Sequence, residues 1–211
     1  MDQYIEKLLQ RYPVLTETAA SIRAAAALMI ECASRGKTIF TGGNGGSASD
    51  ADHITGELLK GFVKKRPLPA AELEKFAAID APGAAELGKQ LQMGIRAVNL
   101  GDAHALISAF GNDVNPHAAL AQRLWTMGEQ GDIFIAISTG GNAENIRLAM
   151  IAARVKKIKT ILLTGSRHGV CRDYADVVVA VPAELTYQIQ ELHLPIYHAL
   201  CMITEGALFN E

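Results

Sequence analysis

The chain has 211 residues, a length that suits one domain with a sizeable core. Hydrophobic residues make up 49% of it and charged residues 20%, as is usual for a soluble globular protein. The formal net charge of -2 argues against the strongly basic surface that is typical of nucleic-acid-binding domains.

The chain shows no sign of export or membrane insertion. Its start, Met1-Asp2-Gln3-Tyr4, lacks the basic and apolar parts of a signal peptide, and we expect no stretch long enough to span a bilayer. The cysteines, Cys32, Cys171 and Cys201, are far apart and form no C-x-x-C pair. We therefore expect a cytoplasmic protein with reduced, mostly buried thiols and with neither a membrane nor a nucleic-acid partner.

The first 35 residues have the periodicity of helices. Ile5, Leu8 and Leu9 form a short apolar stripe, which Pro13 interrupts. A second stripe follows with Gly36 as its predicted C-cap. Its members are Leu15, Ala19, Ile22, Ala26, Met29 and Ile30.

Continuous apolar runs predict buried strands in the rest of the chain. The runs cover 38–41, 133–137, 160–163 and 177–181, with a further strand near 97–100. Helices are predicted over roughly 48–60, from the turn 138–142 to about 155, and from about 186 to 209. Continuous rather than alternating runs are typical of a parallel sheet that is covered on both faces. The sequence therefore predicts a single α/β domain over residues 1–211, doubly wound, with about five parallel strands flanked by helices.

The segment 64–93 does not fit this order of strands and helices. It opens with the basic, turn-forming stretch 64–69 and continues as two short amphipathic patterns separated by Pro82-Gly83. We interpret it as a helical insertion. Two roles stay open, a surface excursion and a lid or subunit contact beside the site, because long excursions in compact α/β domains are often functional.

Two glycine-rich turns, 42–47 and 138–142, each follow a predicted strand and open a helix. Glycines allow close backbone approach, and a helix N-terminus presents free N–H groups to an anion. Neither turn matches a Walker A or a clean G-x-G-x-x-G pattern. Because ligands of doubly wound sheets bind at the carboxyl ends of strands, the two turns predict a phosphorylated small molecule. A sugar phosphate fits better than a nucleotide, since no adenine-binding or ribose-binding signature is present.

Five segments carry a more specific combination of motifs. In chain order they are Gly43-Asn-Gly-Gly-Ser-Ala-Ser-Asp-Ala-Asp-His53, Phe110-Gly-Asn-Asp113, Ala136-Ile-Ser-Thr-Gly-Gly-Asn142, Leu163-Thr-Gly165 and Ile189-Gln-Glu-Leu-His-Leu-Pro-Ile-Tyr-His198. Together they resemble the phosphoheptose isomerases of the sugar isomerase (SIS) family, over nearly the whole chain outside 64–93. The resemblance implies a homotetramer with zinc in its active site. It also implies the interconversion of sedoheptulose 7-phosphate and D-glycero-D-manno-heptose 7-phosphate, a reaction of heptose biosynthesis.

The resemblance also implies roles for individual residues. Glu57 and His198 match the acid/base pair of the isomerisation. The metal-binding positions are His53, Glu57, Gln190 and His198. The positions that contact the substrate or its phosphate are Asn44, Gly45, Gly46, Ser47, Asp113, Ser138, Thr139, Gly140, Asn142 and Gln190.

The spacing of the implied metal ligands limits how they could meet at one ion. His53 and Glu57 are four residues apart on a predicted helix, so both side chains lie on one face. Imidazole and carboxylate, and less usually amide, are ligands of zinc. Gln190 and His198 are eight residues apart, about 12 Å of helix rise. A kink at Pro195 or a site shared between subunits would bring them to one ion, and both alternatives stay open.

Three features depart from the pattern of the phosphoheptose isomerases. Gly140 and Ala143 stand where serines are usual, an arginine that follows the metal-binding helix has no clear counterpart, and 64–93 borders the site. Substitutes for the arginine are Lys60, Lys64, Lys65 and Arg66. Two other functions therefore stay in view, a non-catalytic SIS adaptor or sugar-phosphate-binding regulator, and an isomerase of another sugar phosphate. The adaptor that binds the replication initiator DnaA lacks the full His/Glu/Gln/His set, which favours an enzyme here.

Overall fold

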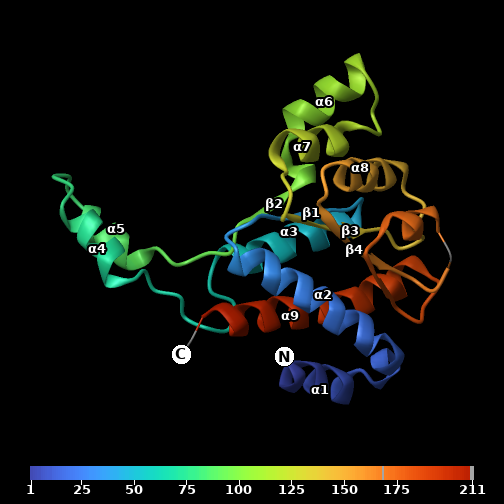
Figure 1. Cartoon of the computed structure of the whole chain (residues 1–211), viewed down its shortest axis with the longest axis horizontal. Helices are drawn as coiled ribbons and strands as arrows, with labels where there is room; N and C mark the ends of the chain where they lie inside the picture. The colour runs from blue at the N-terminus through green and yellow to red at the C-terminus, as the bar shows by residue number, and fades with distance from the viewer. Residues whose placement is uncertain (168, 210–211) are drawn as a thin grey trace.

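The computed structural model describes residues 1–167 and 169–209 (Figure 1). Its N-terminal part is helical, as predicted: α1 (Asp2–Arg11), a 3-10 helix (Pro13–Thr18) and α2 (Ala19–Ser34). The break falls at Pro13, which opens the 3-10 helix because its ring cannot donate a backbone hydrogen bond. Gly36, just beyond α2, has a φ of 65°, the left-handed conformation that ends many helices.

The stretch Pro13–Ser34 is long and apolar enough, by length and composition, to cross a membrane, so the expectation that no such stretch exists is wrong. In the fold, Ile22, Ala26 and Met29 are fully buried in the core, where α2 packs against the last helix, α9 (Thr186–Leu208). The burial of this apolar face accounts for the composition of the segment. The three cysteines are also buried, as expected.

Five parallel strands form the sheet at the centre of the molecule. They are β1 (Ile39–Gly42), β2 (Ala97–Asn99), β3 (Ile133–Ile137), β4 (Lys159–Thr164) and β5 (Val177–Ala180). Their order is β2-β1-β3-β4-β5, and every neighbouring pair is parallel. The predicted doubly wound α/β fold is confirmed, and the predicted strands differ from the observed ones only at their ends.

Helices cover both faces of this sheet (Figure 1). One face packs against α2, α9 and α3 (Gly46–Leu59), with α1 packed in turn on α2 and α9, and the other against α7 (Ala119–Met127) and α8 (Glu144–Val155). Successive residues of β3 alternate between the two layers, with Ile135 facing the first and Phe134 the second. Because both faces are buried, the strand reads as an unbroken apolar run.

The segment 64–93 forms an arm that extends away from the body (Figure 1). It contains α4 (Ala70–Ala77) and α5 (Ala84–Gln90), which pack against each other where the ring of Phe76 meets Gly88. An antiparallel bridge between Pro67 and Gln92 closes its base. A second extension, α6 (His104–Asp113), lies next to α7 and follows β2 through a 3-10 turn (Leu100–Asp102).

Candidate active site

The strand order places the two glycine-rich turns beside each other. The chain runs from β1 to β2 on one side of β1 and then returns to β3 on its other side, so β1 and β3 flank the topological switch point of the sheet. The turn after β1 and the turn after β3 therefore lie at adjacent carboxyl ends, where doubly wound folds bind their ligands. The N-termini of α3 and α8 open at this edge.

A pair of amides joins the two turns. Asn44 Nδ2 donates to Asn145 Oδ1 at 2.8 Å, and Asn145 Nδ2 donates to Asn44 Oδ1 at 2.8 Å. Asn145 lies in the first turn of α8 and was not a candidate from the sequence. The reciprocal pair holds the starts of α3 and α8 in a fixed relation across the switch point.

The turn after β1 needs its glycines. A Cβ on Gly43 would lie 2.3 Å from the carbonyl oxygen of Ser47, so a larger residue there would force the turn apart. Gly45 has a φ of 55°, which side chains other than that of glycine rarely adopt. A Cβ on Gly46 would lie 2.4 Å from Nε2 of Gln190, a flexible side chain of α9. At the start of α3 the N–H groups of Ser47 and Ala48 donate to the carbonyl oxygens of Asn44 and Gly45 at 3.0 Å, whereas within the described residues those of Gly45 and Gly46 donate to no backbone carbonyl and can meet an anion.

The predicted residues of the turn after β3 have different surroundings. Ser138 is buried, and its Oγ accepts from Ala143 N at 3.5 Å. The side chain of Asn142 braces the turn, since it donates to Gly140 O at 3.0 Å and accepts from Val170 N at 3.1 Å. Nothing within 4 Å would contact a Cβ on Gly140, so a serine side chain would fit there.

Within the described residues, Asp113 makes no contact of this kind with the two glycine-rich turns. It is the exposed last residue of α6, and its Oδ1 accepts from Asn112 Nδ2 at 2.8 Å. Among residues 1–167 and 169–209, no hydrogen bond or ion pair joins it to either glycine-rich turn.

The predicted histidine and glutamate residues meet on two neighbouring helices. His53 Nε2 lies 3.2 Å from Glu57 Oε1 on α3 and 3.4 Å from His198 Nε2 on α9. We call these three residues the His/Glu cluster. The side chain of Glu57 is 15% exposed and that of His53 is 41% exposed, so the cluster can be reached from solvent. It begins about 10 Å along α3 from Gly46, given the rise of a helix.

Gln190 lies at the other end of this helix pair. Its Nε2 would be 2.4 Å from a Cβ on Gly46, while His198, two turns further along α9, reaches His53. The two helices therefore run side by side in the same direction, and Pro195 lies inside α9 without ending it. Within one chain, the four implied metal ligands divide into a cluster of three and a separate glutamine. In the described part of the chain, no group of three or more His, Cys, Asp or Glu residues is arranged so that it could hold a metal ion as placed.

Burial and the neighbouring His53 favour a neutral imidazole at His198. Burial lowers the pKa of His198, His53 lowers it further, and Glu57 acts in the opposite direction. Glu57 Oε2 is buried and has no hydrogen-bond partner among the described residues, although Lys60 Nζ lies 3.5 Å away. The cluster thus holds one carboxylate oxygen and two ring nitrogens in close contact.

His193 takes no part in the cluster. It is fully buried, and its Nε2 lies 3.3 Å from the carbonyl oxygen of Thr164 at the end of β4. Burial lowers its pKa to about 4, so the ring is neutral at pH 7. The structure therefore places His193 in the core.

A cleft of about 630 Å³ opens beside His198. Its walls come from α1 and α9 and include Phe62, whose ring centroid is 5.5 Å from that of His198. Lys7 and Arg11 of α1 bring positive charge to its rim. The sequence did not predict that the N-terminal helix lines this cleft, because only tertiary packing brings α1 to α9.

The fold and the site can be compared with known proteins. The model of the SIS domain family matches residues 3–165, more than half of the chain. The chain belongs to the SIS domain family. It is 32% identical to the phosphoheptose isomerase of Shewanella denitrificans, over all of this chain and 95% of that protein.

Two solved structures of phosphoheptose isomerases are also similar to this SIS domain. The one from Neisseria gonorrhoeae is 27% identical with a TM-score of 0.72, covering 97% of this chain and 94% of that one. The one from Francisella tularensis is 29% identical with a TM-score of 0.73, covering 96% and 95%. The resemblance inferred from the motifs is confirmed.

One expectation about this SIS domain is corrected. Arg66, considered as a phosphate-binding substitute, is buried: its Nε donates to Glu205 Oε1 at 2.8 Å and its Nη1 to Leu58 O at 2.9 Å. Glu205 also accepts from the backbone N–H groups of residues 62–64. The pair fastens the base of the arm to α9. Arg66 is therefore a structural residue, which sequence spacing could not reveal because its partner lies 139 residues away.

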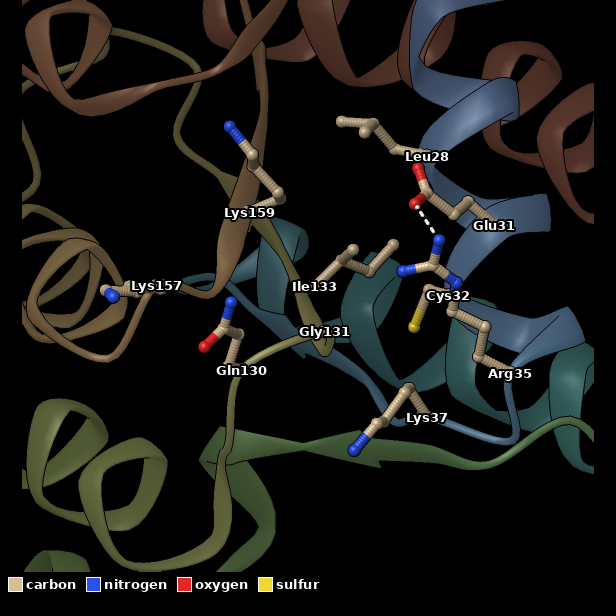
Figure 2. Close-up of a pocket in the computed structure, with 10 residues that line it drawn as sticks. All are labelled: Leu28, Glu31, Cys32, Arg35, Lys37, Gln130, Gly131, Ile133, Lys157 and Lys159. Carbon is tan, nitrogen blue, oxygen red and sulfur yellow. Dashed lines mark ion pairs between the residues drawn. The ribbon is translucent and has the colours of Figure 1, made fainter.

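A second hollow in the SIS domain lies at the opposite edge of the sheet, at the amino ends of β3 and β4 (Figure 2). Several of its basic side chains are already paired. Arg35 contacts Glu31, Lys37 contacts Glu129, and Lys159 contacts Asp176. This hollow is separated from the glycine-rich turns by the length of the strands and forms no part of the candidate site.

Proposed function

We propose that this chain is a ketose–aldose isomerase of sugar phosphates that converts sedoheptulose 7-phosphate to D-glycero-D-manno-heptose 7-phosphate. The observation that carries the proposal is the position of the His/Glu cluster, two of whose members, His53 and Glu57, lie on the helix that starts at the first glycine-rich turn. An anion held at the start of α3 would place the rest of the same ligand along that helix, toward Glu57 and His198. The full-length similarity to phosphoheptose isomerases supports the same reaction.

The two turns would hold the phosphate mainly through backbone N–H groups. Gly140 and Ala143 carry no hydroxyl, which leaves Ser47, Ser138 and Thr139 as the hydroxyl-bearing residues of the turns. Helix N-termini bind phosphate through unpaired N–H groups and through the positive end of the helix dipole. The loss of two hydroxyls is therefore compatible with phosphate binding.

Glu57 and His198 would move the protons of the reaction. Isomerisation removes a proton from the carbon next to the carbonyl, forms an enediol and returns a proton to the neighbouring carbon. A carboxylate is an effective base for the first transfer, and a neutral imidazole can accept and donate protons between the two oxygens. Both groups lie at the cluster, on the solvent-accessible side of α3 and α9.

Zinc is the metal that we propose for this site. Two ligands of one tetrahedral zinc ion, each bound at 2.0–2.1 Å, are about 3.4 Å apart. The separations of 3.2 Å and 3.4 Å from His53 Nε2 to Glu57 Oε1 and His198 Nε2 fit this arrangement. Since no three His or Glu residues in the described part of the chain could hold a metal ion as placed, these three would do so only after their side chains shift, with Gln190 as a fourth ligand only from a different side-chain position or another subunit. When bound, zinc would polarise the substrate carbonyl.

Turnover of ketose phosphates tests the proposed function. The purified, zinc-loaded protein should convert sedoheptulose 7-phosphate faster than hexulose or pentulose phosphates, and a chelator should reduce the rate. Faster turnover of a shorter sugar phosphate would move the proposal to that substrate. No turnover of any ketose phosphate by zinc-loaded protein would instead favour a non-catalytic SIS adaptor.

A homotetramer in the cytoplasm completes the proposal. Gln190 contacts Gly46 rather than the His/Glu cluster, and Asp113 contacts Asn112 on α6, so a second chain is one way to complete a site that uses all of them. The arm also exposes apolar side chains, including Ile79 and Leu87. Sedimentation velocity should give about four times the chain mass of 22.6 kDa. A single species at the mass of one chain would contradict this part.

A further inference from the structure

A short chain of side chains leads from Asp50 to the His/Glu cluster. Tyr197 is buried on α9, and its hydroxyl donates to Asp50 Oδ1 at 3.2 Å. The same hydroxyl lies 3.0 Å from Nδ1 of His53. The tyrosine ring also meets the His53 ring edge-on, with centroids 5.3 Å apart. Neither Asp50 nor Tyr197 was a candidate from the sequence.

The single proton of the phenol decides the state of His53. Because Tyr197 donates that proton to the Asp50 carboxylate, its oxygen can only accept from His53. The hydrogen-bond partners therefore assign a proton to Nδ1 of His53. Nε2 is then the ring nitrogen that holds a lone pair in the neutral imidazole.

The lone pair of Nε2 faces the other two members of the cluster. Glu57 Oε1, an acceptor, lies 3.2 Å away, and His198 Nε2 lies 3.4 Å away. Lone pairs this close together repel one another unless a proton, such as one carried by Nε2 of His198, or a metal ion lies between them. Ligating histidines in metal sites commonly donate their other ring N–H to a fixed acceptor, which sets the ring tautomer.

We propose that Asp50 and Tyr197 are positioning residues that keep the proton of His53 on Nδ1, so that Nε2 is presented to a cation or a proton shared with Glu57 and His198. Of this inference, only the expected effect on zinc binding rests on the proposed function. The hydrogen-bond chain itself does not depend on zinc. It needs only a tyrosine immediately before His198 and an aspartate three residues before His53, and this sequence has both.

Nitrogen NMR of the metal-free protein tests the tautomer directly. In protein labelled with ¹⁵N at its six histidines, with His53 assigned from a His53→Gln variant, wild-type Nδ1 should be protonated and Nε2 unprotonated at a pH where the ring is neutral. Tyr197→Phe keeps the ring but removes the hydroxyl, and both tautomers should then be populated. Asp50→Ala should act in the same direction, because the tyrosine proton becomes free to point at Nδ1.

Zinc affinity provides the second readout. Tyr197→Phe should weaken Zn²⁺ binding by about 10–100-fold, the usual effect of losing such a supporting partner. Tyr187→Phe is the matched control, since it makes the same change on the same helix at a side chain that is exposed. The control should bind Zn²⁺ like the wild type, and thermal unfolding should show that all variants are folded.

The outcomes separate this inference from the proposed function. A wild-type His53 protonated on Nε2 would overturn the inference, whatever the variants do. An unchanged tautomer and unchanged Zn²⁺ affinity in folded Tyr197→Phe would overturn it as well. The expected tautomer in a protein with no isomerase activity would support the inference while the proposed function fails.

Discussion

Replacing Glu57 by glutamine should reduce the turnover number for sedoheptulose 7-phosphate by about 10²- to 10⁴-fold, the usual contribution of a general base. Glutamine has the size of glutamate but cannot accept the proton of the substrate. It also removes the negative charge that faces His53 at 3.2 Å and Lys60 at 3.5 Å. Steady-state kinetics with zinc-loaded protein would measure the loss, and we expect a smaller change in KM than in kcat.

A matched variant separates this effect from a general loss of charge. Glu31→Gln makes the same change on α2, where the carboxylate is 55% exposed and pairs with Arg35 at the opposite edge of the sheet. It should leave the rate unchanged. Equal rates for Glu57→Gln and the wild type would show that the acid/base assignment is wrong, provided that both proteins have the same oligomeric mass and unfolding temperature.

Replacing Arg66 by methionine should lower the free energy of unfolding by about 3–5 kcal/mol, the usual cost of leaving one member of a buried ion pair without its partner. The side chains of Arg66 and Glu205 are 1% and 0% exposed. The change also removes the donor to Leu58 O and the contact of the guanidinium with the ring of Phe209. Urea unfolding followed by circular dichroism would measure the difference.

The exposed pair of Arg23 and Asp2 provides the comparison for that experiment. Its side chains are 43% and 73% exposed, so Arg23→Met should cost about 0–1 kcal/mol. Similar losses for the two arginine variants would contradict the structural role of Arg66. A double variant, Arg66→Met with Glu205→Gln, should regain part of the loss, because it removes the unpaired buried charge and keeps an acceptor for the backbone N–H groups.

The pH dependence of the same pair has a definite sign. Hydrogen bonds from backbone N–H groups and from Arg66 lower the pKa of Glu205, against the effect of burial. A group with a lowered folded pKa contributes its full stability above its unfolded pKa of about 4.3 and loses it as the pH falls through the folded pKa. The difference in stability between the wild type and Glu205→Gln should therefore narrow as the pH is lowered below about 4.

Much of this protein is determined by local sequence. Strands buried on both faces must be apolar at every position, so the run 133–137 revealed β3 without any tertiary information. Glycine-rich turns between a strand and a helix showed where an anion would bind, since few other residues allow that close approach. Helical spacing alone put His53 and Glu57 on one face of α3.

Tertiary structure decided which of these parts meet. The order of the strands brings the turns after β1 and β3 together, and the parallel packing of α3 and α9 sets His198 against His53 while leaving Gln190 at Gly46. The same packing forms the hydrogen bond between Tyr197 and Asp50 and buries Arg66 in an ion pair with Glu205. These contacts join residues far apart in the chain, and periodicity reports only which face of an element is buried, not which partner it meets.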